Sequence, residues 1–63
     1  MSKLAAQYEG KSQPIILGKV CNLTDQIVAL RQSAKGYMDR IRLQALLRDR
    51  DALQAMLRLE RVQ

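Results

Sequence analysis

The sequence predicts an all-α chain folded as a two-helix hairpin, and three observations support that class. Apolar residues in the first half recur at heptad spacing, a basic residue followed by glycine stands near the middle, and the second half holds neither glycine nor proline. We therefore expect one helix over about 15–35 and another over about 37–62, forming a hairpin domain at 14–63. Residues 1–13 are polar with few large apolar groups, so they predict a flexible arm with at most one helical turn, around Leu4–Tyr8.

The first helix is predicted by a single apolar seam whose steps alternate between four and three residues, as one face of a helix requires. Pro14 suits the first turn, where its missing N–H is no loss. Gly18 argues against a helix there, since glycine inside a helix costs about 1 kcal/mol relative to alanine. An extended segment over 15–21 is therefore an alternative, in which the helix begins at Thr24 with its hydroxyl as the N-cap. The members of the seam are Ile16, Val20, Leu23, Ile27, Leu30 and Ala34.

The reversal between the helices is predicted at Lys35 and Gly36, because a basic residue followed by glycine is typical of a helix C-terminus capped by a left-handed glycine. The alternative is one continuous helix from Ile15 to Val62 that tolerates the glycine and is about 70 Å long at 1.5 Å per residue. The residues after the glycine are mostly leucine, alanine, arginine, glutamine and methionine, all good helix formers. The second half is therefore expected to be helical under both arrangements.

The second helix is expected to be apolar on two sides when it is projected at about 100° per residue. A hairpin covers only one of them, and small residues allow close helix approach, so we expect the side with alanines to pack within the chain and the other to bind a partner. The simplest partner is a second copy, which would give a dimeric helical bundle. The first side, which we call the alanine face, consists of Met38, Ile41, Ala45, Ala52, Met56 and Leu59. The second side, the leucine face, consists of Leu43, Leu46, Leu47, Leu53 and Leu57.

Two arginines lie on or beside these faces. Arg50 projects into the middle of the leucine face, and Arg48 lies at the edge of the alanine face. Such a residue either fixes register and partner choice or covers leucine surface with its alkyl stem while the guanidinium reaches water. We include Arg50 with the leucine face as a candidate partner-binding residue.

The chain is basic, with 11 Lys and Arg against 6 Asp and Glu and a formal net charge of +5. This balance brings a polyanionic partner into consideration. Acidic and basic residues are interspersed in the second half, so no block of like charge forms. The candidate phosphate-binding residues are Lys35, Arg40 and Arg58, which make only a thin stripe.

The composition argues against enzymatic, metal and cofactor chemistry. The chain has no histidine, one cysteine and three isolated glycines, so it offers no zinc ligand set, no phosphate loop and no nucleophile with a partnering base. Asp49 and Asp51 are two apart and would point away from each other on a helix. Cys21 is expected to be a small packed residue. No small-molecule substrate, secretory leader or membrane span is expected, and a lone thiol suits the cytoplasm.

The expected function is that of a small non-enzymatic protein–protein interaction module, an accessory or inhibitory subunit that acts through the leucine face. The alternative is a basic nucleic-acid-binding dimer, with residues 13–21 as a ribbon ahead of two helices, which loosely resembles ribbon–helix–helix repressors. A structural brace inside a larger particle is a third class that nothing in the sequence separates from the first. We expect Leu53→Asp to abolish association while leaving much helix, and Ile27→Asp to unfold the chain.

Overall fold

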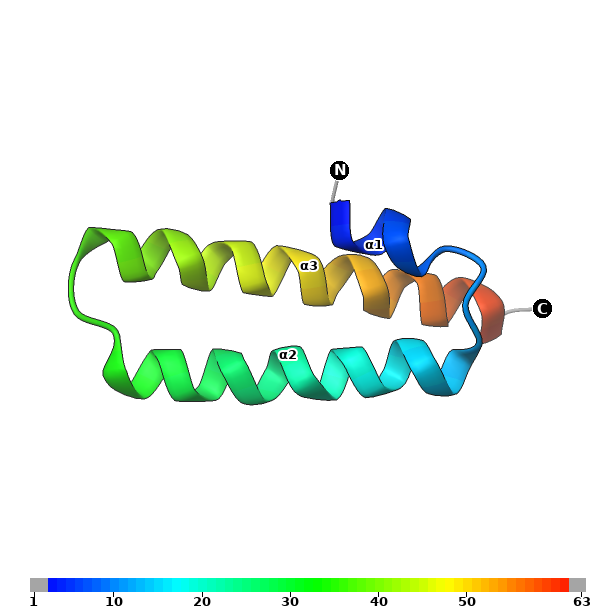
Figure 1. Ribbon diagram of the computed structural model, residues 1–63, viewed down its shortest axis with the longest axis horizontal. Coiled ribbons are helices and arrows are strands. Elements are labelled where there is room, and N and C mark those ends of the chain that lie inside the picture. The colour runs from blue at the N-terminus through cyan, green and yellow to red at the C-terminus, as the bar shows by residue number, and fades with distance from the viewer. Residues whose placement is uncertain (1–2, 62–63) are drawn as a thin grey trace.

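The computed structural model describes the backbone of residues 3–61 and the side chains of residues 3–58. Two long helices run antiparallel and pack side by side, and a short helix lies against the end away from the turn (Figure 1). The predicted hairpin is confirmed and the single continuous helix is wrong. Val62 and the side chain of Leu59 lie outside the described part. The helices are α1 (Lys3–Tyr8), α2 (Gln13–Ser33) and α3 (Tyr37–Arg61).

The first turn of α2 is organised by backbone groups. Ser12 occupies the N-cap position with an extended backbone, and its carbonyl accepts hydrogen bonds from the N–H groups of Ile15 and Ile16, both at 3.1 Å. Pro14 lies in this first turn as predicted, where it has no N–H to leave unpaired. The helix therefore begins two residues before the predicted boundary at about 15.

The alternative of an extended segment over 15–21 is wrong. All of these residues are helical, and Thr24 is an interior residue whose hydroxyl donates to the carbonyl of Val20 at 2.9 Å, one turn back, instead of capping a helix start. Gly18 is tolerated because the seam on both sides of it is buried. The ribbon of the ribbon–helix–helix alternative is therefore not formed.

The turn is centred where it was predicted, but the glycine has a different role. α2 ends at Ser33, Ala34 is already extended, and Gly36 has a φ of 96°. The Gly36 carbonyl accepts a hydrogen bond from the N–H of Arg40 at 3.4 Å, so this glycine leads into α3 and does not cap α2. A positive φ favours glycine here because it has no Cβ.

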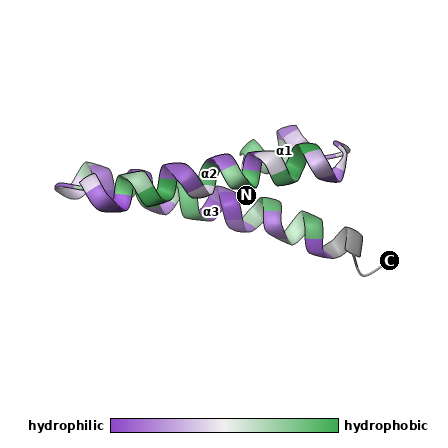
Figure 2. Cartoon of the chain, turned by 90° about the horizontal axis from the view of Figure 1, so that it is seen from below, coloured by the Kyte–Doolittle hydropathy of each residue, from purple (hydrophilic) through white to green (hydrophobic). Residues whose placement is uncertain are grey.

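The core lies between α2 and the C-terminal half of α3. The predicted seam of α2 is confirmed for its first four members, which are buried, and Leu53 of α3 is buried as well. Hydrophobic and hydrophilic residues alternate along both long helices (Figure 2). The buried residues are Ile16, Val20, Leu23, Ile27 and Leu53.

The face of α3 that packs within the chain is centred on Leu53 of the leucine face, so the prediction that the alanine face would pack there is wrong for most of its length, and only Met56 of that face packs against the core cluster. Leu53 is 0% exposed, and Leu46 and Leu57 pack, partly buried, against the same cluster. By contrast, Met38 is 74% exposed and Ile41 is also exposed. Full burial of a leucine side chain stabilises the fold by about 1.5–3 kcal/mol, far more than burial of an alanine methyl group. The hairpin therefore gains more by turning the leucines inward.

The N-terminal segment contributes a packed helix. α1 lies along the C-terminal half of α3 (Figure 1), and Leu4, Ala5 and Tyr8 pack against the core cluster. The chain leaves this helix through Gly10, which has a φ of 82°. The sequence suggested an arm with one turn at most, so the docking of residues 3–8 is a difference from that expectation.

Candidate partner interface

Two large apolar side chains of α2 lie outside the core on one side of the hairpin. Leu17 is 53% exposed and Val28 is 50% exposed. They are 11 residues apart, which is close to three helical turns, so they lie on the same side of α2. Neither residue was predicted to bind a partner, although Leu17, Cys21, Thr24 and Val28 repeat the four–three–four spacing of a second seam.

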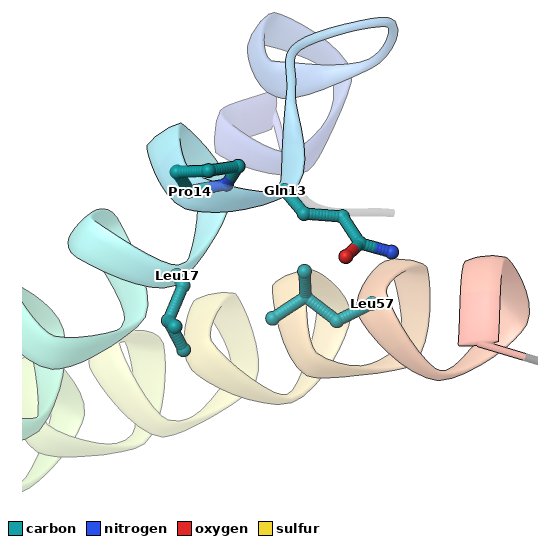
Figure 3. A pocket seen from close by; sticks show the side chains of 4 residues that line it. All are labelled: Gln13, Pro14, Leu17 and Leu57. Carbon is teal, nitrogen blue, oxygen red and sulfur yellow. The ribbon is translucent and has the colours of Figure 1, made fainter.

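The same side of the hairpin is hollowed where α2 meets α3. A cavity of about 330 Å³ is lined by Gln13, Pro14 and Leu17 of α2 and by Leu57 of α3. Figure 3 shows Leu17 and Leu57 reaching from the two helices into the same space. A second hollow of about 200 Å³ adjoins it, with Leu17 and Leu57 as shared residues. The lining residues of the second hollow are Leu17, Val20, Gln54, Leu57 and Arg58.

The leucines of α3 that the core does not bury continue this surface. Leu43 and Leu57 belong to one heptad series, and Leu47 stands seven residues before Gln54, so all lie on the side of the hollows. Leu43, Leu47 and Leu57 are partly buried in the isolated chain. We call this surface the open face: Leu17, Val28, Leu43, Leu47, Arg50 and Leu57.

Arg50 stands midway in the heptad series of the open face, and its position there agrees with the sequence analysis. The residue is partly buried, and its Nε atom is buried without a hydrogen-bond acceptor among the residues that the structure describes. An unpaired buried N–H costs about 1–3 kcal/mol, and more on a charged group. The chain itself covers this atom, so the cost is borne within the fold.

Charged side chains of both signs lie along the edge of the open face. None of its six residues, and none of the residues that line its two hollows, is acidic. Asp51, however, is exposed and stands seven residues before Arg58, so it lies along the same edge as that arginine.

The three candidate phosphate-binding residues are all exposed, at different places. Arg40 stands seven residues before Leu47, and Arg58 lines a hollow of the open face, so both lie along its edge. They are 18 residues apart, which corresponds to about 27 Å along a helix. Lys35 lies in the turn. The structure thus brings no two of them together as one phosphate site.

The opposite side of the hairpin is apolar only near the turn. Met38 and Ala45 are exposed there, whereas Ala52 and Met56 are partly buried at the end where α1 lies. The hollow on this side, about 270 Å³, is mostly polar in its residues: Gln26, Ala29, Leu30, Ser33, Arg42 and Leu46. This side is therefore a weaker candidate for an interface than the open face.

Cys21 is exposed, so the prediction that it is a packed residue is wrong. Its four-residue distance from Leu17 places it beside the open face. Cys21 is exposed because it lies beside the buried seam, and α3 covers only the side of α2 that carries the buried residues.

The amount of exposed surface is large for a chain of this size. The chain exposes 5066 Å², which is about 900 Å² more than expected for a compact monomer of 7.2 kDa. The excess follows from the elongated shape of the hairpin, whose extents are 42 × 20 × 18 Å.

Other classes of site find no support in the described residues. No group of three or more cysteine or acidic side chains that could hold a metal ion occurs between residues 3 and 58. In the same part of the chain no helix is both long and apolar enough to cross a membrane.

Comparisons with protein-family models, with curated proteins and with solved structures find no match to this chain.

Proposed function

We propose that this chain is a small non-enzymatic protein–protein interaction module, an accessory or inhibitory subunit that binds its partner through the open face. The observation that supports this proposal is the pair of hollows between α2 and α3, which share Leu17 and Leu57 as lining residues. On the same side Leu17 and Val28 are each about half exposed. Single exposed leucines are common, but a hollow lined by apolar side chains from two elements is typical of a binding site.

The proposed interface includes part of the leucine face, which the sequence predicted to bind a partner. Leu43, Leu47, Leu57 and Arg50 remain candidate partner-binding residues, since they lie on the side of α3 that carries the hollows, and Leu57 lines both. Leu53 is a core residue and Leu46 packs against the core, so both contribute to the fold of the chain itself. The partner is either another protein or a second copy, and a second copy would give the dimeric helical bundle that the sequence suggested.

The second candidate is a basic nucleic-acid-binding regulator. Exposed Arg40, Arg58 and Lys35, together with a net charge of +5, favour it. The wide spacing of these residues weighs against it.

Site-specific photo-crosslinking tests the proposal. A photo-reactive phenylalanine analogue at position 28, on the open face, is compared with the same analogue at position 29, which lines the hollow on the opposite side. The experiment is made in cells that encode the chain. We expect discrete protein crosslinks from position 28 and few from position 29.

Two outcomes would contradict the proposal. Equal crosslinking from both positions would mean that the open face has no special role. Crosslinks to nucleic acid alone, together with binding to duplex DNA that weakens steeply as salt rises, would favour the regulator instead.

A further inference from the structure

We infer that α1 is a strap that opens and closes on the hairpin while α2 and α3 stay folded, and that its opening uncovers the end of the alanine face at Met56. This inference goes beyond the proposed function, because it concerns the side of the hairpin opposite the open face. It rests on three observations: α1 is short, none of its residues is fully buried, and α2 and α3 form the buried core without it.

α1 has little stability of its own. It has six residues, and an isolated helix shorter than about 12 residues is marginal in water. Lys3 stands in its first turn and Glu9 directly follows its last residue, so each charge lies at the end of the helix dipole that disfavours it. The helix therefore depends on its contacts with the hairpin.

The contacts that hold α1 on the hairpin are limited. Leu4, Ala5 and Tyr8 pack against the core cluster and are only partly buried, whereas the other side chains of the helix are exposed. A partly buried side chain gains less from the hydrophobic effect than a fully buried one, because the gain is roughly proportional to the apolar area removed from water. The free energy of opening α1 is therefore lower than that of unfolding the core.

The hairpin keeps its own structure when α1 leaves. All buried members of the core cluster belong to α2 and α3, and the first turn of α2 is closed by the Ser12 carbonyl, which accepts hydrogen bonds from the N–H groups of Ile15 and Ile16. Residues 9–15 are all exposed, and Gly10 among them has a φ of 82°. Rotation about this linker therefore requires no core side chain to move.

Opening of α1 changes the apolar surface of the alanine face. Ala52 and Met56 are partly buried at the end where α1 lies, whereas Met38 and Ile41 are exposed near the turn. Release of α1 joins the two parts into one apolar strip from Met38 to Met56, which corresponds to about 27 Å along α3. In the closed state the strap hides one end of this strip.

Hydrogen exchange of the full chain, followed by NMR at low urea concentrations, tests whether α1 opens separately. The amides of Tyr8 and Lys11 report on α1, since the Lys11 N–H donates to the Tyr8 carbonyl at 3.0 Å, and the amide of Ile27 reports on the core of the hairpin. We expect protection factors at Tyr8 and Lys11 to be at least about tenfold lower than at Ile27 and nearly independent of urea, as local opening produces.

Two outcomes of the exchange experiment would overturn the inference. Protection at Tyr8 equal to that at Ile27, with the same urea dependence, would mean that α1 opens only when the whole chain unfolds. Complete absence of protection at Tyr8 and Lys11 would mean that residues 3–8 form an arm and not a strap.

Two matched alanine-to-glycine variants separate the two units. Ala6 of α1 and Ala29 of α2 are both exposed helical residues, so glycine weakens each helix by a similar amount. Ala29→Gly should lower the protection of Ile27 about fivefold and leave that of Tyr8 unchanged, because the opening of α1 does not involve α2. Ala6→Gly should lower the protection of Tyr8 about fivefold. A parallel loss at Tyr8 and Ile27 in Ala29→Gly, or no loss at Tyr8 in Ala6→Gly, would overturn the inference.

A thiol on the alanine face measures what the strap covers. Met56→Cys and Met38→Cys, each combined with Cys21→Ser, place a single thiol at the covered end and at the exposed end of the face. Circular dichroism first establishes that both variants remain helical. The thiol at position 56 should react with a thiol-specific reagent at least about threefold more slowly than the thiol at position 38. Ala6→Gly should then accelerate the reaction at position 56 about two- to fivefold and leave that at position 38 unchanged. Equal rates at the two positions, or a rate at position 56 that does not respond to Ala6→Gly, would overturn the covering role of α1.

Discussion

Asp39 links the turn of the hairpin to the helix that follows it, because its Oδ2 atom accepts a hydrogen bond from the backbone N–H of Lys35 at 2.9 Å. Asp39 lies in the first turn of α3. Its negative charge therefore also interacts favourably with the positive end of that helix. One carboxylate thus holds the link between the helices and stabilises the start of α3.

The variant Asp39→Asn should lower the free energy of unfolding by about 1 kcal/mol, since it removes the charge from the hydrogen bond and from the helix end. For a chain this small, the change corresponds to a melting temperature about 4–8 °C lower. Thermal unfolding followed by circular dichroism measures it. Asp51→Asn is the matched control, because it removes the same charge from an exposed position within α3. Equal losses in both variants would mean that the bond to Lys35 contributes nothing.

Two glycine-to-alanine changes should have opposite effects on stability. Gly18 lies within α2, and a Cβ added there would meet no heavy atom within 4 Å. Gly18→Ala should therefore raise the free energy of unfolding by about 1 kcal/mol through helix propensity. Gly36 has a φ of 96°, so Gly36→Ala should lower the free energy of unfolding by about 1–2 kcal/mol through backbone strain.

Urea denaturation of both variants beside the natural chain measures the two changes. A loss of stability in Gly18→Ala would indicate that this part of α2 is not a regular helix. Unchanged stability in Gly36→Ala would indicate that the turn adopts another conformation.

The helices could be predicted from the sequence because their signals are local. Pro14 and Gly36 mark the start of α2 and the turn, and the heptad seam identified the buried side of α2 correctly. Such signals depend on backbone geometry and on spacing along one helix, so a single chain is enough to reveal them.

The assignment of faces on α3 failed because it depends on packing between helices. Leu53 and Met56 lie only about 60° apart around the helix, and periodicity alone does not decide which of two neighbouring apolar sides turns inward. The size of the side chains decides it, and α1, which was not expected to pack, covers part of the alanine face. The partner-binding residues Leu43, Leu47, Leu57 and Arg50 stay predictions, and of these four Leu57 lines the hollows, whereas Leu17 and Val28 were not named.

The burial of Leu53 changes the expected result of its substitution. Leu53→Ala should lower the free energy of unfolding by about 2–5 kcal/mol, because it leaves a cavity among Ile16, Val20 and Leu23. A chain of this length has a total stability of about 3–9 kcal/mol, so Leu53→Asp should unfold it outright instead of only abolishing association.

Circular dichroism at increasing urea concentration measures both variants. Met38→Ala serves as the control and should change the free energy of unfolding by less than about 0.5 kcal/mol, since the residue is largely exposed. A well-folded Leu53→Asp variant would show that this leucine is outside the core, and the original assignment of the faces would then stand.

The exposed thiol of Cys21 gives a direct measure of which side of α2 faces water. In the native chain it should react with a thiol-specific reagent at nearly the rate seen in denaturant, because no conformational opening is required. The matched variant combines Val20→Cys with Cys21→Ser and so moves the thiol by one residue to a buried position. Its reaction should be at least about tenfold slower, since it must wait for local unfolding. Equal rates in the two chains would mean that α2 does not hold one side against α3, and the hairpin itself would then be in question. If the rates differ as expected, the same reaction reports on the open face, because a partner bound beside Leu17 should protect Cys21 from the reagent.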